Sequence, residues 1–142
     1  MARKSKPGRR PAKIVPTVPT TCPCGSGRHY LECCGALHTG ADRATTAEQL
    51  MRSRFSAFAV GDAAYLLRSW HSSTRPARLS LDPGTRWTRL EILGASDGGP
   101  FHSEGTVEFR AYYRQDGAAE EYLHENSTFA RENGAWVYVS AL

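Results

Sequence analysis

The chain has 142 residues, 40% of them hydrophobic, and a formal net charge of +4. These values are typical of one globular domain with its own core and exclude an intrinsically disordered chain. No apolar run approaches the roughly 18 residues that a membrane span needs. The basic start is not followed by the apolar segment of a secretory signal. We therefore expect a cytoplasmic protein in a reducing compartment, with no membrane partner.

The positive charge is concentrated at the N-terminus. Residues 3–13 contain six lysines and arginines and no acidic residue, which leaves 12 basic against 14 acidic side chains in the rest of the chain. Several prolines disfavour a helix there, so we expect residues 1–20 to be a disordered tail. We favour a tail that serves only solubility. The alternative is a weak, nonspecific contact with RNA, because Lys and Arg neutralise phosphates.

All four cysteines lie within one short segment, TCPCGSGRHYLECCG, residues 21–35. Two are separated by one residue and two are adjacent: Cys22, Cys24, Cys33 and Cys34. Four thiolates at such spacing are typical of tetrahedral zinc, and a full set leaves no open position for water, so we expect one structural zinc ion. The alternatives are two disulfides or four unmodified thiols. Disulfides are disfavoured because adjacent cysteines bridge only with strain and because the expected compartment is reducing.

The backbone around the cysteines is expected to contain a turn and a short helix. The turn would present the first two cysteines, and a helix from near Ser26 to Gly35 would present the last two. Gly25 and Gly27 would allow backbone N–H groups to approach the thiolates. The neighbouring basic side chain of Arg28, together with His29, would offset part of the negative charge of the site.

Residues 45–70 have the apolar spacing of helices. A first helix is predicted to begin at Thr45 or Thr46, since each has a capping-box partner three residues later, and to end at Gly61. A second helix, capped by Asp62, is predicted to run to Trp70. The three tryptophans of the chain are expected in the core.

The second half of the chain changes to a period of two after a loop over residues 72–85. Asp116-Gly117 and Asn133-Gly134 are typical turn sequences between strands. The four strands are expected at 87–94, 106–113, 120–131 and 135–141. Two helices followed by four antiparallel strands predict an α+β layered fold for residues 42–142.

Three segments also carry a family resemblance. CPCGSGRHYLECCG resembles the SEC-C zinc motif, which is found at the C-terminus of the SecA translocation ATPase. LMRSRFSAFAVGDAAYLLRSWH and ENSTFARENGAWVYV resemble the helical signature and the closing hairpin of the YchJ-like bacterial family. That resemblance implies a SEC-C zinc module at 21–36, followed by a nuclear-transport-factor-2-like domain, a cystatin-like cone in which a curved sheet wraps around helices and leaves a cavity. It assigns metal-ligand roles to the four cysteines and no catalytic residue.

Polar residues on apolar faces are candidates for the wall of such a cavity. Arg54 falls within the apolar stripe of the first helix at 100° per residue, and Glu125 shares a strand face with apolar neighbours. Because an unpaired buried charge is costly, we predict an Arg54–Glu125 ion pair. His71 and Tyr65 are further candidates for this pocket. The structural alternatives are that Arg54 only ties the helix to the sheet or reaches its edge, and that His71 caps a helix C-terminus.

Two functions fit these patterns. We prefer a non-enzymatic binding protein whose zinc module contacts a protein or ribosomal partner, as SEC-C modules do elsewhere. The alternative is a small-molecule enzyme or sensor in which Arg54 holds an anion and His71 acts as acid or base. A third hypothesis, less favoured than these two, is a redox switch that releases zinc on oxidation. No triad order, phosphate loop or dinucleotide motif is present, so no catalytic residue is predicted. By analogy with domains of this shape, a homodimer through the open sheet face is also expected.

Overall fold

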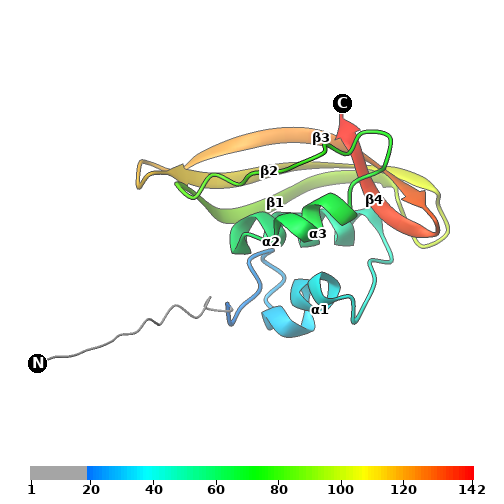
Figure 1. Cartoon of the computed structure of the whole chain (residues 1–142), viewed down its shortest axis with the longest axis horizontal. Coiled ribbons are helices and arrows are strands. Elements are labelled where there is room, and N and C mark those ends of the chain that lie inside the picture. The colour runs from blue at the N-terminus through cyan, green and yellow to red at the C-terminus, as the bar shows by residue number, and fades with distance from the viewer. Residues whose placement is uncertain (1–18) are drawn as a thin grey trace, which may run out of the picture.

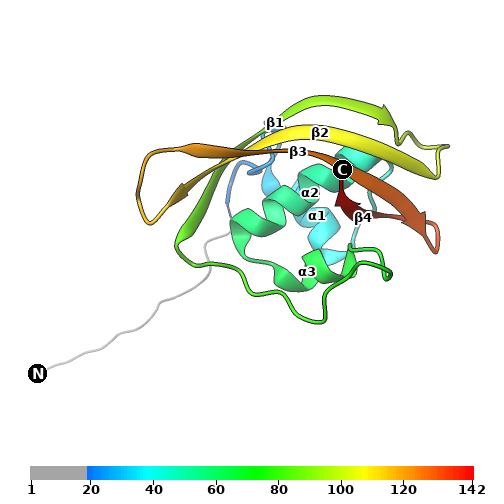
Figure 2. The same cartoon turned by 90° about the horizontal axis from the view of Figure 1, so that it is seen from above.

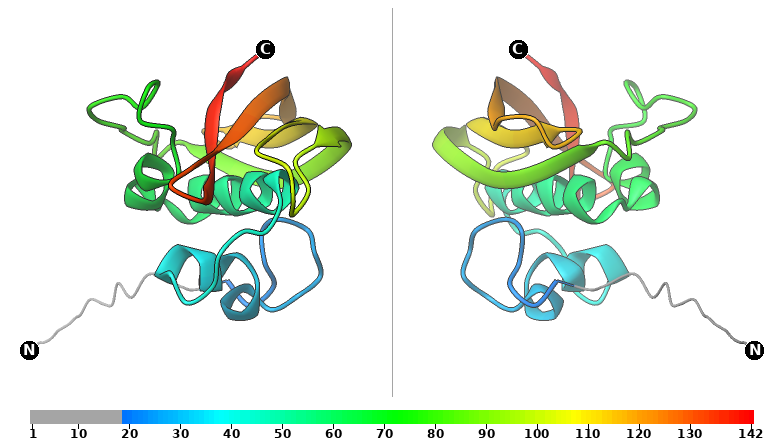
Figure 3. Two further views of the ribbon diagram at one scale, coloured as in Figure 1. Left: turned by 90° about the vertical axis from the view of Figure 1, so that its right-hand side faces the viewer. Right: turned by 90° about the vertical axis from the view of Figure 1, so that its left-hand side faces the viewer.

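Three layers make up residues 19–142, the part of the chain that the computed structural model describes (Figures 1 and 3). A four-stranded sheet covers one side of the central helices, and the cysteine-containing module lies on their other side. The predicted tail, including its candidate RNA-contact segment 3–13, lies outside the described residues except for positions 19 and 20. The elements follow in the order 3-10 helix η2 (Tyr30–Glu32), α1 (Cys34–Thr39), α2 (Ala47–Val60), α3 (Ala63–Arg68), β1 (Thr85–Asp97), β2 (Glu104–Gln115), β3 (Glu121–Glu132) and β4 (Ala135–Ala141).

The sheet is an antiparallel meander with strand order β1-β2-β3-β4, which confirms the predicted α+β fold. Asn133 and Gly134 connect β3 to β4 with φ angles of 54° and 84°. These are the left-handed values that a two-residue hairpin turn requires. The register between β1 and β2 shifts at Trp87/Arg89 and again at Ile92/Gly94. Such irregularities increase local twist, and the sheet curves around α2 (Figure 2).

Helix boundaries follow the capping signals closely. Thr46 is the N-cap of α2, and its hydroxyl accepts a hydrogen bond from the Gln49 N–H at 3.0 Å. The last helical residue is Val60, and Gly61, the predicted end, is the C-cap with a φ of 81°. α3 begins after Asp62 as predicted, but it ends at Arg68 rather than at Trp70. It stops early because Trp70 forms a bridge with β4, which draws the chain away from the helix axis.

The main core lies between α2 and the concave face of the sheet. Its buried members are Ala47, Leu50, Met51, Phe55, Val107, Phe109, Ala111, Phe129 and Trp136. The indole N–H of Trp136 donates to the Thr45 carbonyl at 3.2 Å, so this buried polar group is satisfied. Trp70 and Trp87 are only half-buried, unlike the core positions predicted for them, because they border a cavity. Within the described residues, no helix combines the length and apolar character that crossing a bilayer requires.

Candidate functional site

A tight turn presents the first two cysteines. The N–H of Cys22 donates to the Arg28 carbonyl at 2.9 Å, and the N–H of Gly25 donates to the Cys22 carbonyl at 3.2 Å. Gly25 and Gly27 have φ angles of 84° and 83°, which residues with a Cβ rarely adopt. The glycines of this segment therefore fold the turn that places Cys22 and Cys24 side by side.

The second pair of cysteines stands at a junction of two short helices. Cys33 follows η2 and is the N-cap of α1, and Cys34 is the first residue of α1. The predicted helix from Ser26 to Gly35 was wrong, because the left-handed conformation of Gly27 interrupts it. Gly35 lies inside α1 rather than at a helix end, and a Cβ there would stand 2.7 Å from the Tyr30 carbonyl oxygen. A close approach of two backbone segments thus requires this glycine.

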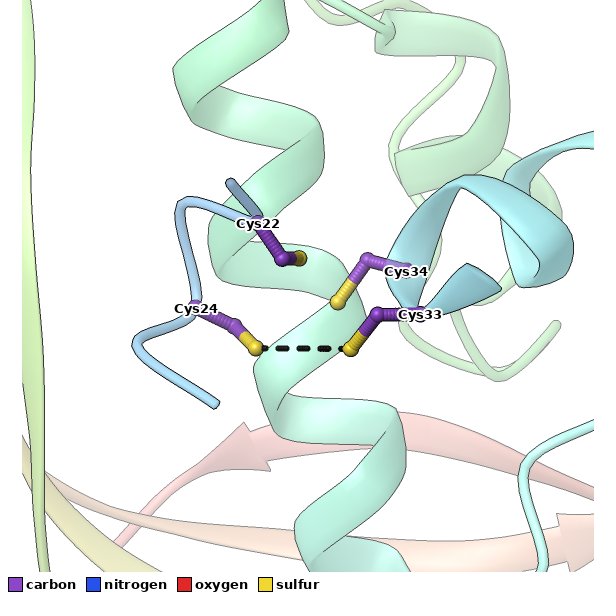
Figure 4. A group of neighbouring side chains, drawn as sticks. All are labelled: Cys22, Cys24, Cys33 and Cys34. Carbon is purple, nitrogen blue, oxygen red and sulfur yellow. Dashed lines mark hydrogen bonds between the residues drawn. The ribbon is translucent and has the colours of Figure 1, made fainter. Parts of the chain in front are cut away.

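These two segments bring the four thiols together, with their sulfurs pointing toward one another (Figure 4). The four Sγ atoms all lie within 4.8 Å of one another, and the Sγ atoms of Cys24 and Cys33 are 3.8 Å apart. Three of the side chains are buried and Cys33 is half-buried. The set could hold one metal ion, and the structure places together all four residues that the sequence predicted as ligands.

Because the four thiols are close together, the pKa of each one depends on its neighbours. Hydrogen bonds from Cys24 and Cys34 lower the pKa of Cys22. For Cys34 the direction is opposite: its hydrogen bonds with Cys22 and Cys24, together with burial, raise its pKa. Neighbouring thiolates repel, so only a bound cation lets all four ionise at neutral pH. The four thiols could therefore hold a metal ion together.

The module is seated on α2 by side chains of that helix. Arg52 donates from Nη1 to the Cys24 carbonyl at 2.9 Å, and the Ser56 hydroxyl lies 3.5 Å from the Cys22 sulfur. The sulfur cluster therefore contacts the main domain directly, and the thiolate charge would be shared with a helix hydroxyl.

His38 of α1 is a polar link between the cysteine-containing module and α2 of the main domain, which is called the body below. Its Nε2 lies 2.8 Å from the carbonyl oxygen of Ser53, and its Nδ1 lies 2.6 Å from the Tyr30 hydroxyl. A carbonyl can only accept, so Nε2 carries the proton and Nδ1 accepts from Tyr30. The ring is 8% exposed and lies 4.6 Å from the ring of Tyr65. No sequence pattern pointed to His38, since it stands between the cysteine segment and the first predicted helix.

Tyr65 belongs to this linking region and does not line the predicted pocket. Its hydroxyl lies 2.7 Å from the Ser53 Oγ, which itself donates to the Leu50 carbonyl. Tyr65 therefore donates to Ser53, and burial raises the pKa of the phenol. It stands on α3 facing the module side of α2, which explains why it is absent from the wall of the cavity described next.

An apolar cavity of about 280 Å³ lies between α2 and the sheet. Arg54 and Glu125 both line it, as the face analysis predicted. Half of the lining residues are aromatic: Phe55, Phe58, Trp70, Trp87, Phe109 and Tyr138.

The predicted ion pair between Arg54 and Glu125 does not form among the described residues. Arg54 is 4% exposed and donates from Nη1 to the Leu66 carbonyl at 2.8 Å and to the Ser69 hydroxyl at 2.7 Å. Its guanidinium also lies 4.7 Å from the ring centroid of Tyr138. Neutral dipoles of α3 and an aromatic face thus take the place expected for a carboxylate, and burial lowers the pKa of Arg54 to about 10.

His71 lies outside the cavity, contrary to the prediction. Because α3 ends early, the chain turns at this point and the His71 N–H donates to the Tyr138 carbonyl at 2.7 Å. The His71 ring faces a separate surface hollow. Its Nδ1 is 2.7 Å from the Ser73 hydroxyl, and its Nε2 is 3.9 Å from a carboxylate oxygen of Glu132. His71 and Arg54 therefore cannot act on one molecule in this cavity.

Comparison with known proteins agrees with both parts of the structure. Residues 20–36 match the model of the SEC-C motif, and residues 46–141 match that of the YchJ middle NTF2-like domain. A UPF0225 protein from Streptomyces coelicolor is 59% identical over 87% of this chain and 94% of its own length. The chain belongs to the YchJ-like UPF0225 family. A UPF0225 relative from Corynebacterium glutamicum is 55% identical over 82% of this chain and 92% of its own.

Two solved structures extend the UPF0225 comparison to the fold. A SEC-C motif containing protein from Rhodopseudomonas palustris superposes with a TM-score of 0.74 at 34% identity, over 86% of this chain and 97% of that one. Another from Psychrobacter arcticus gives a TM-score of 0.70 at 27% identity, over 87% and 82%. The predicted combination of a SEC-C module with a nuclear-transport-factor-2-like domain is thereby confirmed.

Proposed function

We propose that this protein is a cytoplasmic, non-enzymatic binding protein that holds one structural zinc ion and docks on a protein or ribosomal partner through the zinc module. The close cluster of four cysteine sulfurs carries this proposal. Sulfurs placed tetrahedrally about 2.3 Å from a zinc ion stand about 3.8 Å apart. The separation of 3.8 Å between Cys24 and Cys33 fits that value, and the remaining sulfurs lie within 4.8 Å.

The role of the zinc would be structural. Four thiolates fill a tetrahedral coordination shell and leave no position for water or substrate. The module's own apolar cluster consists only of Cys22, Cys24, Cys34 and Tyr30, with Cys33 packed against it. So small a core supplies little folding energy, and in such modules metal binding supplies most of it.

The outer surface of the module supports a docking role. Leu31 is 56% exposed, and the basic Arg28 and His29 are exposed beside it in the sequence. The module stands on the opposite side of α2 from the sheet, so this surface is not covered by the main domain (Figure 3). An exposed aliphatic side chain next to positive charge suits a negatively charged partner surface that also offers an apolar contact, and Arg28 could neutralise a phosphate of ribosomal RNA.

Co-sedimentation with purified ribosomes tests this role. We expect the zinc-loaded chain to sediment with ribosomes at low salt and to dissociate as salt is raised. Leu31→Ala should weaken binding about fivefold or more while leaving zinc content unchanged, as for a central interface residue. Phe101→Ala is the matched control, because Phe101 is fully exposed on the distant β1–β2 connection. Sedimentation that is absent, or equal for wild type and Leu31→Ala, would argue against docking through the module.

A further inference from the structure

The cavity between α2 and the sheet contains a buried cation that has no carboxylate partner among the described residues. Arg54 is 4% exposed, and none of the salt bridges within residues 19–142 includes it. A buried charge without a counterion is unfavourable, and its cost falls when an anion enters. The one acid on the cavity wall, Glu125, is half-buried and accepts a hydrogen bond from the Ser127 hydroxyl at 3.1 Å.

One edge of the Arg54 guanidinium remains available. Its hydrogen bonds to described residues both leave from Nη1. Nε and Nη2, which lie side by side in the guanidinium plane, make none within this part of the chain. Two parallel N–H donors at such an edge match the two oxygens of a carboxylate.

A second donor near Arg54 also lacks an acceptor. The Trp70 indole Nε1 is buried and has no hydrogen-bond partner within residues 19–142. The Trp70 ring lies 5.0 Å from the Arg54 guanidinium carbon, and both residues line the cavity. Buried donors without partners are rare in native proteins, so the surroundings of Arg54 are poor in acceptors, and an anion that enters the cavity meets little competition for the guanidinium.

The shape and size of the cavity restrict which ligands can enter it. The volume of about 280 Å³ is at the small end of ligand pockets, which suits a molecule of one or two rings. Aromatic walls favour a flat aromatic body through edge and offset stacking. Leu123, which is 41% exposed, lines the same space and marks where the cavity reaches solvent.

We propose that this cavity binds a small aromatic monocarboxylate, with the carboxylate on the Nε–Nη2 edge of Arg54 and the ring between the aromatic walls. Glu125 lies on the sheet side of the cavity and selects against ligands with a second negative group. The site involves no cysteine ligand and is independent of the metal centre.

Calorimetric titration with two probes of nearly equal shape tests the site on the full-length chain. We expect 2-naphthoate to bind saturably and at least about tenfold more tightly than the neutral 2-naphthalenemethanol, since a hydrogen-bonded charge pair contributes at least that much. Arg54→Met should remove the preference, so that the two probes differ by less than about twofold. Arg114→Met is the control, because Arg114 is exposed and outside the cavity.

A further variant leaves Arg54 untouched in case its replacement prevents folding. Glu125→Gln removes the negative charge from the wall, so naphthoate should bind about two- to fivefold more tightly and the alcohol should be unaffected. Equal affinity of wild type for the two probes overturns the proposal. So does the absence of saturable naphthoate binding at millimolar concentration, or full retention of the preference in a folded Arg54→Met variant.

Discussion

Replacing Cys34 by serine is expected to abolish stoichiometric zinc binding and to unfold the N-terminal module. Cys34 is a buried member of the sulfur cluster and the first residue of α1, so its loss removes a ligand and a packing contact together. Loss of an outer-shell partner typically costs 10–100-fold in metal affinity, so loss of a direct ligand should cost more than about 100-fold. Competition with a chromophoric chelator measures the affinity, and circular dichroism reports the loss of α1.

Ser26→Ala is the graded control for that experiment. The Ser26 hydroxyl lies 3.2 Å from the Cys33 sulfur, but Ser26 is not one of the proposed metal ligands. Its removal should lower zinc affinity by about 10–100-fold at most and leave one zinc ion per chain. A Cys34→Ser protein that retains one tightly bound zinc ion would contradict the four-thiolate assignment, whatever the behaviour of Ser26→Ala.

Replacing His38 by alanine is expected to produce the second large effect, a loss of stability of the contact between module and body. The change leaves the buried Tyr30 hydroxyl without its partner and removes the His38 bond to the Ser53 carbonyl, which keeps its own hydrogen bond within α2. An unsatisfied buried group costs about 1–3 kcal/mol and the lost ring leaves a cavity, so the free energy of unfolding should fall by about 2–4 kcal/mol. Urea denaturation of the zinc-loaded protein measures this difference.

His124→Ala is the matched control for the buried histidine. His124 is exposed on β3 and pairs with Glu108 at 2.7 Å, and exposed pairs contribute about 0.2–1 kcal/mol. A loss of stability for His38→Ala no larger than that for His124→Ala would show that the Tyr30–His38–Ser53 chain does not hold the module to the body.

The parts of the fold that could be predicted from the sequence are those set by neighbours along the chain. Thr46, Gly61 and the Asn133-Gly134 turn are each determined by the conformational preference of one or two residues, so the corresponding element ends were predicted closely. The four cysteines likewise lie within one short segment. A local turn and one helix start suffice to gather them, and the candidate ligand set could therefore be predicted complete.

The errors concern contacts between distant segments. Arg54 was correctly placed on the inner face, but its hydrogen-bond partners lie in α3 and at its C-cap. No local sequence signal predicted that α3 would end early. The same early end moved His71 out of the cavity. His38 stands in a segment of small residues with no strong periodicity, and its importance depends on Tyr30 and Ser53, which meet it only in the folded chain. Face analysis predicts the direction of a side chain, whereas the choice among acceptors in that direction depends on tertiary packing.

Metal content of the untagged protein, purified without added metal and measured by mass spectrometry of the elements, tests the central proposal most directly. The proposal predicts one zinc ion per chain and no thiol that reacts with a thiol reagent before a chelator is added. A folded protein that carries no zinc, with four freely reactive thiols, would contradict it.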